Sequence, residues 1–275
     1  METNLKSNRL RKLPVCALAV ITSLSCLIAG PVVLHASVPP AFSNGSLKGS
    51  FSVLLSKWRS DPNSNPEVLV GVFDFDGAGN LSITSFTDNT GGTITSGTGS
   101  GSYSVKGDGT GAVAVSLSNG DQGTFSIVMD AKGKGFQMML TVCNNGCGNN
   151  VLIGTAVATG GTSFSNASLK GAHELLTTQW TSSQNSNAQI DLGILTFDGA
   201  GKVKASVTQD SAGKVTTIKA TGTYSVNSDG SGSLMLTSKQ GSITFAFAID
   251  SAGKGLQLIK AVSGDSVQSG TTTQQ

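Results

Sequence analysis

The sequence predicts an all-β protein made of two tandem eight-stranded antiparallel β-barrels. Its 275 residues include 36 glycines, only 12% are charged, and short alternating runs separate Asp/Asn/Gly turns, as in all-β proteins. The chain also repeats itself. Residues 42–58 (FSNGSLKGSFSVLLSKW) return as 164–180 (FSNASLKGAHELLTTQW), and FDGAG at 75–79 returns at 197–201, both 122 residues later. A unit of about 115 residues can bury its own core, which indicates two complete domains.

The first 36 residues resemble a secretory signal. Four basic residues between positions 6 and 12 precede an apolar run at 15–29, and polar sequence follows Ala36. Two alternatives remain open. A membrane anchor needs about 20 uninterrupted apolar residues, and polar residues interrupt this run. A lipoprotein would be lipidated at Cys26, but apolar sequence continues beyond that cysteine. We expect a signal peptide at 1–36, one barrel at 37–158, a linker at 159–163 and the second barrel at 164–275. The protein would then be exported, to the periplasm or the cell exterior.

Loss of the signal changes the charge balance. It removes 4 of 18 basic and 1 of 16 acidic residues, which leaves 14 against 15 and a net charge of about −1. No run of like charge remains. This balance argues against nucleic acid and anionic membrane as partners, and we expect no membrane insertion after cleavage.

Eight strands can be assigned in each unit. In the first they are expected near 47–57, 68–75, 80–87, 93–105, 111–117, 123–129, 135–143 and 150–158. In the second they are expected near 169–179, 190–197, 202–208, 214–226, 232–238, 242–249, 255–262 and 266–273. Short turns join antiparallel neighbours, so the predicted topology is a meander that closes without exposed edges. Two β-sandwiches are the alternative.

The alternation of apolar residues assigns the core. Positions that match in phase between the units are Phe125, Ile127 and Met129 with Phe245, Phe247 and Ile249, Val113 and Val115 with Leu234 and Leu236, and Leu81 and Ile83 with Val203 and Ala205. An eight-stranded barrel is either filled by side chains or holds one small ligand. An open interior would be lined by Phe51, Tyr103, Phe125 and Tyr224.

Cys143 and Cys147 are expected to form a disulfide. The hairpin between the last two strands is four residues longer in the first unit, which centres its loop on residues 144–146 and places the two cysteines opposite each other. A disulfide suits an exported protein. A redox pair or half of a metal site are the alternatives.

Acidic glycine motifs are expected to form turns. Asp74 and Asp76 resemble the start of a calcium loop, but Thr196 replaces Asp74 in the second unit and no distal glutamate follows. A weak cation site at Asp74 and Asp76 is the alternative to turn chemistry. We predict no metal site and no cofactor.

The sequence offers little for catalysis. His173, the one histidine after the signal, stands at the position of Phe51. We expect it to be a tolerated side chain in a strand, at the barrel rim, rather than a base. No nucleophile elbow, paired-carboxylate signature or HExxH motif occurs. The protein is therefore predicted not to be an enzyme.

The long loop after the first strand of each unit is the candidate binding region. In each unit a tryptophan precedes it and an Asn-Ser-Asn lies within it. The six candidate ligand-binding residues are Trp58, Asn63, Asn65, Trp180, Asn185 and Asn187. Loops at a barrel mouth often carry binding. Alternatively, each tryptophan plugs a barrel end and each asparagine caps a turn.

The motifs SLKGSF, FDGAGNLS and GSYSVKGDGTGAV resemble those of exported tandem β-repeat proteins of Gram-negative bacteria, a group mostly without assigned function. The resemblance covers residues 42–273 and implies export and a lipocalin-like barrel, without an active site. We expect a non-enzymatic protein that binds a small apolar molecule or serves as an envelope or extracellular component. Its partner would be such a molecule or a cell-surface component. A structural or adhesive surface protein with filled barrels is the alternative.

Overall fold

The computed structural model describes residues 41–58, 65–143, 151–161, 163–181, 188–264 and 266–275, without the side chains of Trp58 and Thr181. Residues 39–275 form one compact unit, and both barrels lie within it. No helix in the described part of the chain is long and apolar enough to cross a bilayer.

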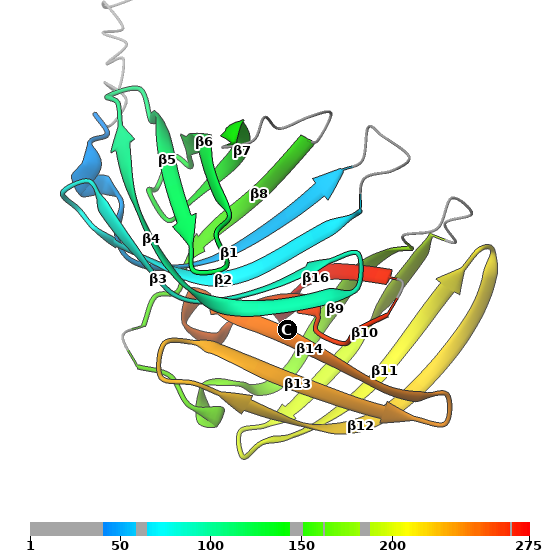
Figure 1. Cartoon of the computed structure of the whole chain (residues 1–275). Helices are drawn as coiled ribbons and strands as arrows, with labels where there is room; N and C mark the ends of the chain where they lie inside the picture. Colours follow the sequence, from blue (N-terminus) through cyan, green and yellow to red (C-terminus); the bar gives the residue numbers. More distant parts are fainter. Residues whose placement is uncertain (1–40, 59–64, 144–150, 162, 182–187, 265) are drawn as a thin grey trace, which may run out of the picture. The chain divides into compact units, whose positions relative to one another are not determined.

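Two closed eight-stranded barrels follow each other along the chain, as predicted (Figure 1). Barrel 1 consists of β1 (Lys48–Trp58), β2 (Glu67–Asp76), β3 (Asn80–Thr90), β4 (Thr93–Val105), β5 (Thr110–Leu117), β6 (Gln122–Met129), β7 (Gly135–Cys143) and β8 (Val151–Ala158). Barrel 2 consists of β9 (Lys170–Thr181), β10 (Gln189–Asp198), β11 (Lys202–Ser211), β12 (Lys214–Val226), β13 (Ser231–Ser238), β14 (Gly241–Asp250), β15 (Gly255–Lys260) and β16 (Ser266–Gln274). The described residues also form three short 3₁₀ turns, η1 (Asn44–Ser46), η2 (Asn166–Ser168) and η3 (Ser251–Gly253). Each barrel is an antiparallel meander whose first and last strands pair, rather than a sandwich. The strand ends agree with the predicted ranges to within three residues.

A tyrosine in each barrel anchors the 3₁₀ turn that leads into the first strand. The Tyr103 hydroxyl donates to the main-chain oxygen of Leu47 at 2.8 Å and to that of Asn44 at 3.1 Å. Tyr224 makes the equivalent bonds to Leu169 and Asn166. The carbonyl groups of Leu47 and Leu169 follow the turns and receive the hydroxyl as a donor, while those of Asn44 and Asn166 also accept the main-chain N–H groups of the turns. The bonds fasten each turn across one end of its barrel.

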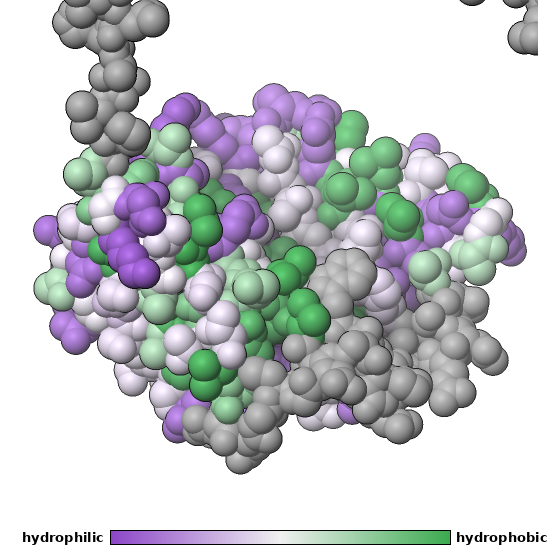
Figure 2. Space-filling model, turned by 90° about the horizontal axis from the view of Figure 1, so that it is seen from above, coloured by the Kyte–Doolittle hydropathy of each residue, from purple (hydrophilic) through white to green (hydrophobic). Residues whose placement is uncertain are grey.

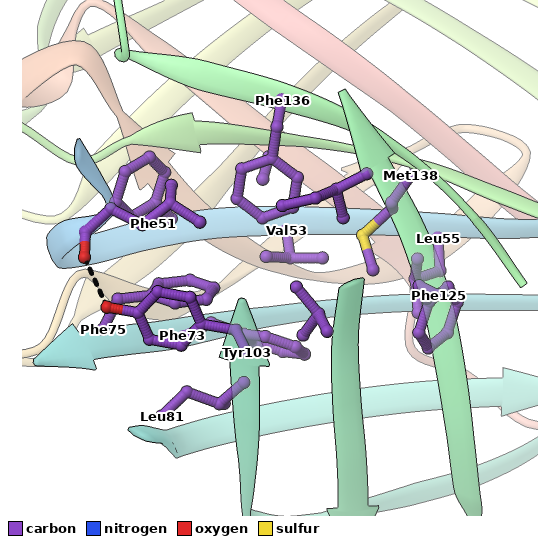
Figure 3. Close-up of a cluster of buried hydrophobic side chains, with 14 of the residues drawn as sticks. Phe51, Val53, Leu55, Phe73, Phe75, Leu81, Tyr103, Phe125, Phe136 and Met138 are labelled. Carbon is purple, nitrogen blue, oxygen red and sulfur yellow. Dashed lines mark hydrogen bonds between the residues drawn. The ribbon is translucent and has the colours of Figure 1, made fainter. Parts of the chain in front are cut away.

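Aromatic side chains fill the interior of barrel 1 near this closed end. Phe75 makes edge contacts with Phe51, Tyr103 and Phe136, with ring centroids 5.0–5.8 Å apart. Figure 3 shows these rings pointing inward from different strands. The predicted core residues are buried, except Val115, which is half-buried against the same cluster.

Strand β2 is apolar on both faces because its outer face packs on barrel 2. Leu69, Phe73 and Phe75 point into barrel 1. The outward residues Val68, Val70 and Val72, here called the β2 stripe, are 1–2% exposed. They cluster with the outward residues Ala248, Ile259 and Val267 of barrel 2, called the β14–β16 face. Alternation alone had assigned only the inward set, so this second core was missed.

Polar contacts surround this inter-barrel cluster. Gln257 Nε2 donates to Thr155 Oγ1 at 3.2 Å, and Asn89 Nδ2 donates to the Lys260 main-chain oxygen at 2.9 Å. Strand β3 has a bulge at residues 84–85, where its register with β4 shifts. The bulge turns the Ser85 hydroxyl toward Asp229 of barrel 2, 2.9 Å away.

Candidate ligand pocket in the second barrel

The two barrel interiors differ in polarity at three neighbouring inward positions. In barrel 1 these positions are Leu55, Leu69 and Leu152, all buried and apolar. The equivalent residues of barrel 2, 122, 122 and 116 positions later, are Thr177, Asp191 and Gln268, also buried. A barrel that could be filled with leucine therefore holds a buried polar cluster instead.

Asp191 is the centre of this cluster. Gln268 Nε2 donates to its Oδ2 at 2.7 Å, Thr177 Oγ1 donates to the same oxygen at 3.1 Å, and Gln209 Nε2 donates to Oδ1 at 3.1 Å. Gln189 shares its amide between the two oxygens, at 3.2 Å to each. All four partners are neutral, so hydrogen bonds hold the buried carboxylate without a counter-charge.

A pocket of about 210 Å³ opens beside Asp191 toward the end of barrel 2 where β13 passes into β14. Its walls are apolar and include Leu175, Val207, Ile218, Leu236 and Phe245. Its polar lining includes Gln189, Gln209 and Ser242. For comparison, a dry cavity of about 150 Å³ is enough to take up benzene. The site thus combines apolar walls with one carboxylate, as small-molecule sites do.

The pocket exists because small side chains replace large ones. Val207 stands at the position of Phe86, and Ala205 at that of Ile83. Both replaced residues are buried in the barrel 1 core. The space that forms the pocket in barrel 2 is therefore filled in barrel 1 by the Phe86 ring.

At the same end of barrel 1 the polar groups are charged. Lys57 Nζ and Glu67 Oε2 form an ion pair at 3.1 Å, and Asp88 is buried beside them. Burial, and then the charge of Glu67, raises the pKa of Asp88 to about 7. Oδ1 of Asp88 has no hydrogen-bond partner among the described residues. The equivalent positions in barrel 2 are Gln179, Gln189 and Gln209.

His173 lies in strand β9, as expected, but its side chain points into barrel 2 and not to the rim, so the rim placement was wrong. It is 0% exposed and meets the Phe197 ring edge-on at a centroid distance of 5.1 Å. Burial lowers its pKa, and Nε2 has no described partner. Its inward position on β9 accounts for this, because it occupies the place of Phe51. His173 is a core residue in this structure.

The four residues expected to line an open interior are packed in the cores. Phe51, Tyr103, Phe125 and Tyr224 are 2–6% exposed, and both tyrosine hydroxyls are used by the 3₁₀ turns. Aromatic content was the wrong signal for a cavity. The informative one was available in the sequence, since aligning the repeats places Asp191 on an inward position where barrel 1 has leucine.

The candidate loop residues lie mostly outside the described part of the chain. This holds for Asn63, Asn185, Asn187 and the Trp58 side chain. Asn65 is exposed and lies against Gly91. Trp180 is the last residue but one of β9, whereas its match Trp58 is the last residue of β1. Its side chain is half-buried and packs against the inter-barrel cluster, outside the barrel. Ligand binding by these six residues stays a prediction.

The expected disulfide is only partly within the described residues. Cys143 ends β7 and takes part in an interaction there. Cys147 lies outside the described residues. The Cys143–Cys147 pairing therefore also stays a prediction.

The Asp74–Asp76 motif forms a turn. Asp76 Oδ1 accepts the main-chain N–H groups of Ala78, Gly79 and Asn80 at 2.7–3.0 Å, and the Asn80 amide bonds Oδ2 at 2.7 Å. The Asn80 side chain and these N–H groups lower the pKa of Asp76 to about 2. In the described residues no three His, Cys, Asp or Glu side chains gather as a metal site would require.

No family model matches the chain, and no curated protein matches it. Similar solved structures include a DUF3598-family protein of unknown function from Nostoc punctiforme, at 11% identity and a TM-score of 0.28, covering 84% of this chain and 97% of that one. Kievitone hydratase from Nectria haematococca has 7% identity and a TM-score of 0.28, with 86% and 93% covered. A protein assigned as AttH from Nitrosomonas europaea has 8% identity and a TM-score of 0.28, with 82% and 92% covered. At these values the likeness transfers no activity to this chain.

Proposed function

We propose that the protein is an exported, non-enzymatic binding protein. Its ligand is a small molecule with an apolar body and a cationic or hydrogen-bond-donating head group, held in the pocket of barrel 2. The observation that carries this is the buried carboxylate of Asp191 at the edge of an apolar pocket of about 210 Å³. Export is supported by the signal-like residues 1–36.

The geometry favours a donor or a cation over a purely apolar ligand. Asp191 has only neutral partners, so a ligand cation would supply the counter-charge that the barrel lacks there. The Gln189 amide is the easiest partner to displace, because it is half-buried and divides its bond between two oxygens at 3.2 Å. An anionic ligand would meet the carboxylate and be repelled.

Calorimetric titration with three ring compounds of similar size tests this proposal. Benzylamine carries a cation, toluene carries no polar group, and benzoate carries an anion. We expect weak binding of benzylamine, of about millimolar affinity for so small a molecule. Toluene should bind more weakly and benzoate not at all.

The matched variant is Thr177→Leu/Asp191→Leu/Gln268→Leu, which gives barrel 2 the three leucines of barrel 1. It should lose its preference for benzylamine over toluene. Equal binding of benzylamine to both proteins would show that the carboxylate is not the recognition element. Absence of benzylamine binding to the wild type would overturn the proposed ligand chemistry.

A further inference from the structure

Barrel 2 exposes an apolar stripe at the positions that barrel 1 buries. The equivalent pairs, 122 residues apart, are Val68 and Ile190, Val70 and Leu192, and Val72 and Ile194. The β2 stripe is 1–2% exposed, whereas Leu192 is 61% exposed. Ile190, Leu192 and Ile194 are here called the β10 stripe. Leu176 lies beside it on β9, paired with Leu192, and corresponds to Leu54, which packs against the inter-barrel cluster.

The converse holds for the surface that receives the β2 stripe. The residues of barrel 1 equivalent to Ala248, Ile259 and Val267 are Val128, Met139 and Val151, here called the β6–β8 face. All three point outward and are 50–56% exposed. Ile153, paired with Met139, extends this face. Barrel 1 therefore offers an uncovered receiving surface, and barrel 2 an uncovered inserting one.

These two surfaces account for most of the exposed apolar bulk. Of twelve large apolar side chains exposed in the described part of the chain, eight belong to them, counting Leu176 and Ile153. Figure 2 shows apolar side chains gathered in patches between polar ones on one face of the molecule. Gathered apolar side chains mark an interaction surface, whereas isolated ones are ordinary.

A polar pair of the inter-barrel interface is also present twice. Gln257 Nε2 bonds Thr155 Oγ1 at 3.2 Å between the barrels. The equivalent residues are Gln137 on β7 and Thr271 on β16, both exposed. The uncovered surfaces thus keep one polar pair of the buried interface in addition to its apolar character.

We propose that a second copy of this chain covers these surfaces, with the β10 stripe of one molecule packed on the β6–β8 face of the next. The contact would repeat between molecules the contact that joins the two barrels within one. It uses two different surfaces, so it is heterologous and extends head to tail into a filament or closes into a ring. Repeat proteins that remain soluble monomers have terminal repeats with polar outer faces. The two barrels of this chain instead have exposed apolar outer faces.

The intermolecular contact would be weaker than the internal one. Within the chain the linker supplies an effective concentration of about millimolar, which separate molecules must reach in solution. Barrel 2 also has no bulge between β10 and β11, so the Ser85–Asp229 bond has no exact copy. The Asn89 bond is lost as well, because Asp210 stands at that position and cannot donate. We therefore expect reversible, concentration-dependent association.

Sedimentation velocity of protein purified after expression of the full chain tests this proposal. We compare the wild type with Leu192→Lys, which charges the β10 stripe, and Met139→Lys, which charges the β6–β8 face. Met235→Lys, at a 44% exposed position on β13, three strands from the β10 stripe, is the control. The wild type and the control should form species that grow with concentration, while each of the other two variants stays monomeric. Circular dichroism establishes that the variants are folded.

Mixing the two monomeric variants gives the decisive result. Leu192→Lys keeps the β6–β8 face and Met139→Lys keeps the β10 stripe, so the mixture should form one-to-one dimers and nothing larger. Self-association of either variant alone would show a different, isologous contact and overturn the proposal. A wild type that stays monomeric at its highest soluble concentration would overturn it too. So would a monomer that floats with phosphatidylcholine vesicles, since the covering partner would then be a membrane.

Discussion

Gln268 Nε2 bonds Asp191 Oδ2 at 2.7 Å and thereby joins β16 to β10 inside barrel 2. In barrel 1 the same two positions are Leu152 and Leu69, which belong to the apolar core. One repeat thus holds a carboxylate–amide pair where the other holds two leucines. The protein provides its own comparison for the energetics of a buried polar cluster.

Asp191→Leu alone should destabilise the protein by about 1–3 kcal/mol, because it leaves the Thr177 hydroxyl and one N–H of Gln268 without an acceptor. The Gln268 amide keeps only its bond to Thr177 Oγ1, at 2.6 Å. The triple variant Thr177→Leu/Asp191→Leu/Gln268→Leu removes donors and acceptor together and should be less destabilised than the single one. Urea unfolding monitored by circular dichroism measures both. A triple variant that loses the sum of the three single effects would contradict a coupled cluster.

Asp88→Asn should raise stability at neutral and higher pH. The pKa of Asp88 is raised to about 7 in the folded protein, against about 3.9 in an unfolded chain. The folded state therefore holds a proton that the unfolded state has lost, and stability falls as pH rises between about 4 and about 7. Above about pH 7 the folded protein must ionise Asp88 in its buried site, which lowers the free energy of unfolding by up to about 4 kcal/mol. Asp88→Asn removes this penalty.

Urea unfolding of the wild type and Asp88→Asn at pH 4, 6 and 8 measures this difference. Asp108→Asn is the control, because Asp108 is exposed and the Thr110 side chain and N–H lower its pKa instead. The stability difference between Asp88→Asn and the wild type should grow with pH. A difference that is the same at all three pH values would contradict the buried, protonated carboxyl group.

Tyr103→Phe and Tyr224→Phe should each destabilise the protein by about 1–3 kcal/mol. Each change leaves one main-chain carbonyl group, that of Leu47 or Leu169, without its hydroxyl donor. The carbonyl groups of Asn44 and Asn166 keep the main-chain N–H donors of the 3₁₀ turns. Thermal unfolding measures the loss, with the exposed Ser225→Ala on β12 as the control. Since the two sites are equivalent, similar losses are expected. A loss below that of the control would contradict the anchoring role.

The strands and the topology of both barrels could be predicted from the sequence. The features that distinguish one barrel from the other could not. Alternation and Gly-rich turns predict all sixteen strands, because register in a meander follows from short turns and a single buried face. Strand β2 breaks that assumption: Val68, Val70 and Val72 are buried on the second face, and a strand apolar at both phases could have signalled it. The Asp191 pocket depends on which inward positions carry small or polar residues, visible only when the repeats are aligned. The bulge at residues 84–85 does have a signal in the aligned repeats. The offset falls from 122 at Ile83 and Ala205 to 121 at Phe86 and Val207, so barrel 1 has one extra residue at this point.

Chains 37–160 and 161–275, expressed separately, should each fold and should bind each other through the inter-barrel cluster. Independent folding follows from the two separate barrel cores. With Trp58→Phe in the first chain, Trp180 is the only tryptophan in the mixture, and it packs against the cluster. Its emission should shift to the blue on mixing. Val70→Lys in the first chain should abolish the shift, and failure of both chains to unfold cooperatively would contradict two independent domains.

The most direct test of the pocket is a methyl NMR titration with benzylamine. We expect the methyl signals of Leu175, Val207, Ile218 and Leu236, which line the pocket, to shift saturably. Val53, the barrel 1 counterpart of Leu175, should not move, because it is fully buried in a filled core. Shifts confined to the exposed Leu192 and Met139, or no saturable shift at all, would contradict a ligand site inside barrel 2.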